Sequence, residues 1–221
     1  MLVRTLLAPL LIAIPVVATA RSGGTAHLYA YTVKDRAAFE RGYRQHLRWH
    51  AGHADKLAWF AWYVTGGDRA GAFVDGTFGT TPDGLAGRPD PEGDGADFRA
   101  NAGPFVTPIG DEGWELWREA SHATSLEDRR PGELIHVYVV AADDKTGFEA
   151  AIGARPFRGA AWYRATGKAT GHYLLIVPAR SAGSPPPLVS LIGNIPAHAL
   201  RAETWRYAPR LALMPGEPLA P

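Results

Sequence analysis

Three histidines near the end of one expected helix are the residues of this sequence best suited to chemistry. At about 100° per residue, His46, His50 and His53 fall within an arc of roughly 60°, on the same side as Phe39 and Tyr43. These side chains should therefore point toward the interior. A histidine pair four residues apart on one helix face can share a metal ion. We predict a metal site formed by the three histidines.

The same histidines have other interpretations. Burial favours the neutral imidazole that a metal ligand or a general base requires, whereas a helix C-terminus favours the cation. Histidines at helix ends often cap carbonyl groups or hydrogen-bond strand residues. Gly52 is a typical helix stop, so His53 can lie past the helix and off the arc. Metal ligand, proton-transfer group and structural histidine all stay open.

A lone carboxylate is the second candidate. Asp75 lies in the stretch Phe73–Phe78, which reads as a largely apolar strand. A buried carboxylate must be paired or protonated, and pairing with His50 or His53 would orient an imidazole as base or ligand. We name His50 and Asp75 as the candidate catalytic pair. The alternative is a bulge or edge position, because Gly76 follows directly.

Tryptophans are the third feature. Trp49, Trp59 and Trp114 have no counterpart in the second half of the chain, and we predict that with His46 they line a ligand pocket. Tryptophans that recur in both halves are better explained as core residues, namely Trp62 with Trp162 and Trp117 with Trp205.

The elements that must position these residues follow from local patterns. Asp35 can cap a helix that runs to about residue 51. Residues 81–112 are rich in proline, glycine and aspartate, and indicate a long loop with one short helix near 97–102. Strands are expected in the first half at 26–33, 59–64, 72–78 and 114–121.

An internal repeat organises the chain. Residues in the first strand and helix recur at one fixed offset in the second half, and the run Ala61-Trp62-Tyr63 recurs as Ala161-Trp162-Tyr163. The matches at fixed offset are His27 with His136, Tyr29 with Tyr138, Asp35 with Asp144, Phe39 with Phe148 and Glu40 with Glu149. Each half therefore reads as β-α-β-β-α-β, the ferredoxin-like plan.

By this repeat and element order, over about residues 26–211, the sequence resembles the dimeric α/β-barrel superfamily in its fused form. The resemblance implies an α+β protein of two tandem ferredoxin-like repeats, with their sheets packed face to face as an α/β barrel. It also implies a choice among small monooxygenases, haem enzymes such as chlorite dismutases, and proteins without a known reaction. The haem of chlorite dismutases lies in the second repeat, whereas these histidines lie in the first.

Composition and the first residues indicate an exported protein. Residues 1–20 combine Arg4, an apolar run and a small-x-small end, which is typical of a signal peptide cleaved between Ala20 and Arg21. We expect a periplasmic or secreted protein without a stable membrane anchor after cleavage. The 23 basic and 22 acidic residues make nucleic acid an improbable partner, because phosphate binding needs a basic patch. The absence of cysteine excludes disulfides, thiolate catalysis and cysteine metal ligands.

The expected organisation is a signal peptide at 1–20, repeat 1 with the site at 21–128, and a linker at 129–133. A structural repeat 2 follows at 134–211, and a loose C-terminal tail at 212–221. We predict binding of a small aromatic or apolar molecule in a pocket of repeat 1, by a monomer or homodimer. The alternatives are a haem-dependent, metal-dependent or cofactorless oxidoreductase or monooxygenase using His46, His50 and His53, and a non-catalytic structural protein of the envelope. Haem, a divalent metal and no cofactor are all open.

Overall fold

The computed structural model describes residues 24–122, 126–155, 159–167 and 170–221. The expected signal peptide at 1–20 lies outside these residues. Among the helices of the described chain, none is long and apolar enough to cross a membrane.

Strands and helices follow one another in a similar order in both halves, with one additional helix in the first. The first half runs β1 (Thr25–Val33), α1 (Arg36–Gly52), β2 (Phe60–Gly67), β3 (Phe73–Thr80), α2 (Pro82–Ala86), α3 (Pro91–Asn101) and β4 (Val106–Leu116). The second half runs β5 (Leu134–Ala142), α4 (Lys145–Gly153), β6 (Ala161–Ala165), β7 (His172–Pro178), α5 (Val189–Ile192) and β8 (Ala197–Tyr207).

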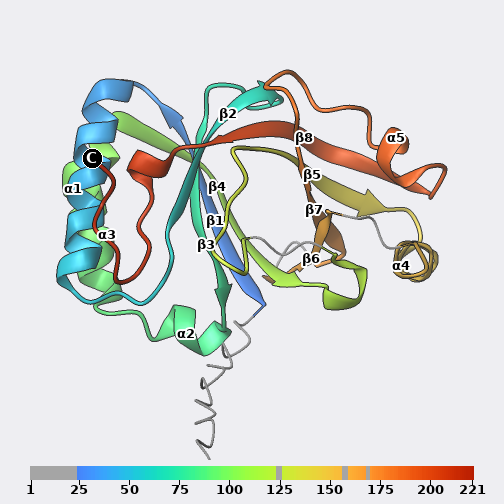
Figure 1. Cartoon of the computed structure of the whole chain (residues 1–221), viewed down its shortest axis with the longest axis horizontal. Coiled ribbons are helices and arrows are strands. Elements are labelled where there is room, and N and C mark those ends of the chain that lie inside the picture. Colours follow the sequence, from blue (N-terminus) through green and yellow to red (C-terminus); the bar gives the residue numbers. More distant parts are fainter. Residues whose placement is uncertain (1–23, 123–125, 156–158, 168–169) are drawn as a thin grey trace, which may run out of the picture.

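All eight strands form one closed antiparallel barrel, in the order β1-β3-β2-β8-β5-β7-β6-β4. The two halves are hydrogen-bonded to each other along both edges, where β2 pairs with β8 and β4 with β6. The expected α+β class is therefore right. The expected face-to-face packing of two sheets needs correction, because the sheets are continuous at both edges. Figure 1 shows α1 and α3 on one side of the barrel and α4 and α5 on the other.

Helix α1 follows the expected pattern closely. The Asp35 side chain accepts a hydrogen bond from the amide of Ala38 and caps the helix, which ends at Gly52 with His53 as its C-cap. Its buried face is Ala38, Phe39, Tyr43, His46, Leu47 and His50. Helix α4 in the second half is 9 residues long, against 17 for α1. The additional turns of α1 carry the two buried histidines.

The segment expected as a long loop with one short helix near 97–102 instead holds all of α2 and α3 and the start of β4. Helix α3 begins with Pro91 at its first position, and the side chain of Asp90 accepts a hydrogen bond from the amide of Gly93. The strand expected at 114–121 is observed at Val106–Leu116. Proline is rare inside a sheet because it has no N–H group to donate. Pro108 is tolerated in β4 where it pairs with Tyr31, just after a register shift in the β1–β4 ladder.

Three apolar clusters make up the core. One draws residues from all eight strands and fills the barrel, with Trp62 and Trp205 at its centre. The second lies between the barrel and α1 and α3, and the third lies under α4. Trp162 belongs to the third cluster and packs against Phe148 of α4. Trp62 and Trp162 match in sequence but lie on opposite faces of the barrel wall.

Strand register also shows which tryptophan of the first half corresponds to Trp205 of the second. Trp114 pairs with Ala26 on β1, and Trp205 pairs with Ile135 on β5, at corresponding places in the two halves. Both rings belong to the barrel interior. The sequence match of Trp205 with Trp117 is therefore wrong by three residues, and Trp114 does have a counterpart.

The last residues are held against the first half. Leu213 exchanges two backbone hydrogen bonds with Trp59, and the guanidinium of Arg44 donates to the carbonyl groups of Arg210 and Ala220. Since Leu213 is also buried, the expectation of a loose tail is wrong.

Candidate metal centre

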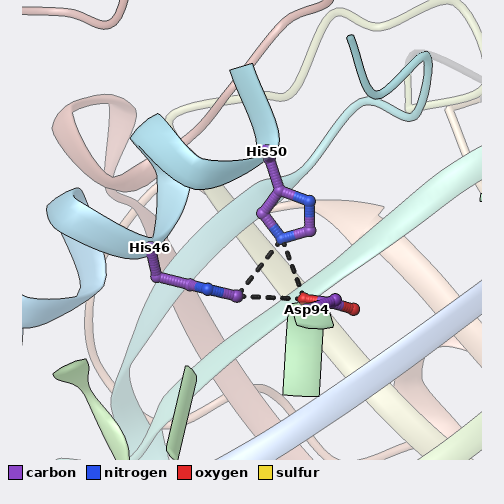
Figure 2. A group of neighbouring side chains, drawn as sticks. All are labelled: His46, His50 and Asp94. Atoms are coloured by element: carbon purple, nitrogen blue, oxygen red, sulfur yellow. Dashed lines mark hydrogen bonds and ion pairs between the residues drawn. The ribbon is translucent and has the colours of Figure 1, made fainter. Parts of the chain in front are cut away.

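Two histidines of α1 and one aspartate of α3 direct ligand atoms at one point (Figure 2). The Nε2 atoms of His46 and His50 are 3.2 Å apart. The Oδ1 atom of Asp94 is 3.4 Å from Nε2 of His46 and 3.3 Å from Nε2 of His50. The three atoms form a nearly equilateral triangle, which we call the ligand triangle.

Outer carboxylates fix both rings. Nδ1 of His46 lies 2.8 Å from Asp97 Oδ2, and Nδ1 of His50 lies 2.8 Å from Asp55 Oδ2. A carboxylate only accepts, so each Nδ1–H donates, and in the neutral imidazole the Nε2 atom then carries the lone pair that a metal ion requires. Histidines that bind metals usually carry such an outer carboxylate, which sets their tautomer and orientation.

Asp55 is itself held as a carboxylate. Burial alone would raise its pKa, but hydrogen bonds from His50, the Leu57 amide and the Trp59 indole outweigh burial and lower the pKa below its ordinary value. The position of His50 is therefore set by an anion that is anchored by three donors.

The electrostatics of the triangle call for a cation. Burial, followed by the neighbouring His50, lowers the pKa of His46 and favours its neutral form. If both imidazoles are neutral, as metal ligands must be, two lone pairs and a carboxylate oxygen face one another within 3.4 Å. Such an arrangement is repulsive by itself and becomes favourable when a positive ion lies between the atoms.

The size of the triangle is that of a tetrahedral site. Ligands at about 2.0–2.1 Å from zinc, separated by the tetrahedral angle, lie about 3.3–3.4 Å apart, whereas right-angled ligands lie about 2.9–3.0 Å apart. The observed edges of 3.2, 3.3 and 3.4 Å match the tetrahedral value better. Three protein ligands of this kind leave a fourth position for water or substrate.

A cavity of about 220 Å³ adjoins the triangle. The second oxygen of Asp94 accepts a hydrogen bond from Arg88, which lies at the cavity wall. The cavity is smaller than the roughly 300–1,000 Å³ typical of sites for drug-sized ligands. Its walls combine aromatic side chains with titratable or charged ones and are formed by Tyr29, Tyr31, Tyr43, His46, His50, Trp59, Asp75, Arg88, Pro91, Asp94, Gly95, Phe98 and Arg99.

Asp75 lies in this cavity but not where the sequence suggested. Its Oδ2 accepts a hydrogen bond of 2.6 Å from the hydroxyl group of Tyr43, so the expected pairing with His50 or His53 is wrong. Asp75 does share a face with Phe73, toward α1. Its Oδ1 atom is buried and has no hydrogen-bond partner among the described residues. Burial is the main cause that raises the pKa of Asp75 to about 7.

Of the other predicted site residues, one lies at the cavity and the rest lie away from it. Trp59 lines the cavity and donates to Asp55, whereas Trp114 lies in the barrel interior and does not line this cavity. His53 is exposed, hydrogen-bonds the carbonyl group of Trp49 and stacks on its ring. Neither His53 nor Trp49 contributes to the triangle or the cavity, so Asp94 replaces His53 in the predicted set of ligands.

Sequence reasoning missed the acidic residues that complete the centre. Asp94 and Asp97 lie one turn apart on α3, within the segment interpreted as loop. A signal was present, because Asp90-Pro91 is a typical helix start and the two aspartates follow at helical spacing. Asp55 was passed over as a residue of the turn after α1.

A haem does not fit the residues present. The Nε2 atoms of His46 and His50, the atoms that would bind iron axially, face each other at 3.2 Å with Asp94 beside them. This space suits a single ion and excludes a macrocycle.

The comparisons with known proteins bear on the fold. No protein-family model matches the chain, and no curated protein matches it. The structure is similar to a solved structure described as a putative chlorite dismutase, TA0507, with a TM-score of 0.53 and 9% identity, covering 85% of this chain and 95% of that one. A second, described as an anthrone oxidase-like protein, has a TM-score of 0.47 and 14% identity, covering 90% and 96%. The first likeness shows a shared fold.

Proposed function

We propose that this protein binds one divalent metal ion, with zinc as the best fit, through His46, His50 and Asp94. The observation that carries the proposal is the ligand triangle, with edges of 3.2–3.4 Å and both histidines oriented by outer carboxylates.

The ion would serve chemistry on a small molecule in the adjoining cavity. A bound divalent ion polarises oxygen atoms and makes bound water or hydroxyl groups more acidic. The protein residues hold it and leave its open position toward a cavity of about 220 Å³ with partly aromatic walls. This supports the expected binding of a small aromatic or apolar molecule, and it supports the metal-dependent enzyme among the alternatives. A cavity that reaches His50 speaks against a purely structural envelope protein.

Iron is the second candidate ion. Two histidines and one carboxylate are also the ligands of non-haem iron(II) oxygenases, which bind through one triangular face of an octahedron. The observed edges are longer than about 3.0 Å, the value for that geometry, and therefore favour zinc.

We also make two proposals about the whole chain, one on its internal repeats and one on its export. We infer that the two halves are ferredoxin-like repeats, which is supported by their similar element order and by Asp35 and Asp144 capping corresponding helices. We also propose that the protein is exported and that the mature chain begins at Arg21.

Titration of untagged, metal-free protein with zinc in a calorimeter tests the metal centre. We expect one zinc ion per chain. His50→Ala should weaken binding by more than about 100-fold, because outer-shell partners alone are worth roughly 10–100-fold. His53→Ala is the matched control, since it removes an exposed histidine of the same region outside the triangle, and should bind as the wild type does. Equal affinity of the His50→Ala protein and the wild type would refute the assignment.

A further inference from the structure

Asp75 has an unusual surrounding for a carboxyl group. It is buried on β3, and only one of its two oxygen atoms has a hydrogen bond, from Tyr43. The other, Oδ1, has no partner in the part of the chain that the structure describes. Buried polar atoms are nearly always paired, so an unpaired oxygen at a cavity wall points to a ligand that pairs with it.

Asp75 and the ligand triangle share one cavity. The side chains of Asp75, His46, His50 and Asp94 all line the cavity of about 220 Å³. Within the described residues, Asp75 has no hydrogen bond or ion pair to any of the three ligands. A small molecule bound to the ion would therefore share the cavity with Asp75.

The charges around Asp75 suit a proton acceptor. Burial raises its pKa, the hydrogen bond from Tyr43 lowers it and the charge of Asp94 raises it again, to about 7. A base with a pKa near the working pH is the most effective in catalysis. The titratable or charged groups that share its cavity are Tyr29 and Tyr31 of β1, Tyr43, His46 and His50 of α1, Arg88, and Asp94 and Arg99 of α3.

No other group at this cavity is as free to take a proton. Both ring nitrogens of His46 and His50 are committed to a carboxylate and to the triangle. Burial raises the pKa of Tyr29 to about 12, and the hydroxyl group of Tyr43 already donates to Asp75.

We propose that Asp75 is the proton acceptor for neutral acids that bind the metal as anions, such as water or a molecule with an acidic hydroxyl group. This inference rests on the proposed metal centre. The O–H bond of the acid breaks, its electron pair stays on the oxygen that binds the metal, and the proton bonds to Oδ1 of Asp75. The positive ion and the proton acceptor would then act on the same bound molecule.

Acetohydroxamic acid is a suitable probe, because it is neutral in solution and chelates metals as an anion. Calorimetry of its binding to the zinc-loaded protein, in buffers with different heats of protonation, counts the protons released. The titration is run at about pH 6.5, where zinc-bound water still holds both protons. Zinc in the triangle would lower the pKa of Asp75 from its value in the metal-free protein, because a nearby positive charge favours the carboxylate, so that Asp75 can take up a proton at this pH.

The wild type should release far less than one proton, because Asp75 keeps it. Asp75→Asn should release about one proton per hydroxamate bound, and the exposed control Asp83→Asn should behave as the wild type. Equal proton counts for Asp75→Asn and the wild type would overturn the inference, and so would a hydroxamate that fails to bind the zinc-loaded protein. Failure to bind zinc at all would instead remove the metal centre itself.

An infrared measurement on the wild type keeps the inference testable if Asp75→Asn does not fold. A protonated carboxyl band should appear in the difference spectrum when the hydroxamate binds, and should shift when aspartate is labelled with carbon-13. The absence of such a band would contradict the inference.

Discussion

At the scale of single residues, the centre depends on histidine–aspartate pairs, and the spacing of residues in the sequence does not predict them. The periodicity of α1 predicted that His46 and His50 share a buried face, because the helical repeat fixes their direction. Their partners Asp55, Asp94 and Asp97 come from other elements. Contacts between elements depend on tertiary packing, and a sequence pattern does not specify them.

Asp75 gives a prediction on pH. The folded protein raises its pKa from 3.8 to about 7, mainly through burial. Between roughly pH 4 and 7 the unfolded chain loses this proton and the folded protein keeps it, so stability falls as the pH rises through this window. The cost above pH 7 is of order 4 kcal/mol, at about 1.4 kcal/mol per unit of pKa.

Asp75→Asn should remove this cost. We expect urea denaturation of the metal-free proteins to show Asp75→Asn gaining stability over the wild type between pH 4.5 and pH 8, by a few kcal/mol. Asparagine keeps an acceptor for Tyr43. The control Asp83→Asn should follow the wild type, and a difference between Asp75→Asn and the wild type that does not change with pH would contradict the account.

At the scale of elements, α3 is the weakest part of the centre. None of its residues is buried, and its interior contains Gly93 and Gly95, each costing about 1 kcal/mol relative to alanine. An apolar stripe is what makes a helix visible in a sequence, and α3 has none. For this reason the segment was interpreted as a loop, and Asp94 was overlooked.

A metal ion should therefore order α3. Because the ion would connect α1 to α3, zinc should slow hydrogen exchange at the amides of residues 94–101 in the wild type. Exchange in α4, far from the ion, serves as the internal control. His50→Ala should show no slowing at 94–101. Zinc that slows exchange equally in both proteins would bind elsewhere.

At the scale of the whole molecule, the sequence predicted the class, the element order and the barrel, because strand periodicity and an internal repeat are local or linear signals. It did not predict the joined edges or the register. Trp205 corresponds to Trp114 and not to Trp117, since register depends on bulges such as the one between Ala30 and Tyr31.

Barrel closure gives a prediction on stability. Gly67 lies in the β2–β8 ladder that joins the halves, with a φ of +92°, and a Cβ there would overlap the carbonyl group of Ala202. Gly71 has nearly the same φ, +93°, with nothing within 4 Å of a Cβ. Gly71→Ala should cost about 1–3 kcal/mol through backbone strain.

Gly67→Ala should cost roughly 1–3 kcal/mol more, because the overlap adds to the strain. Thermal or urea denaturation of the two variants measures the difference. Equal losses would show that the contact between β2 and β8 at this point contributes little to holding the barrel closed.

The most direct test of the account is X-ray absorption at the zinc edge of the untagged, zinc-loaded protein. We predict one zinc ion per chain with four nitrogen or oxygen ligands at about 2.0–2.1 Å, two of them showing the outer-shell scattering of imidazole. His50→Ala should lose one imidazole, and His53→Ala none. Zinc with no imidazole ligand, or with three that fall to two in His53→Ala, would contradict the centre formed by His46, His50 and Asp94.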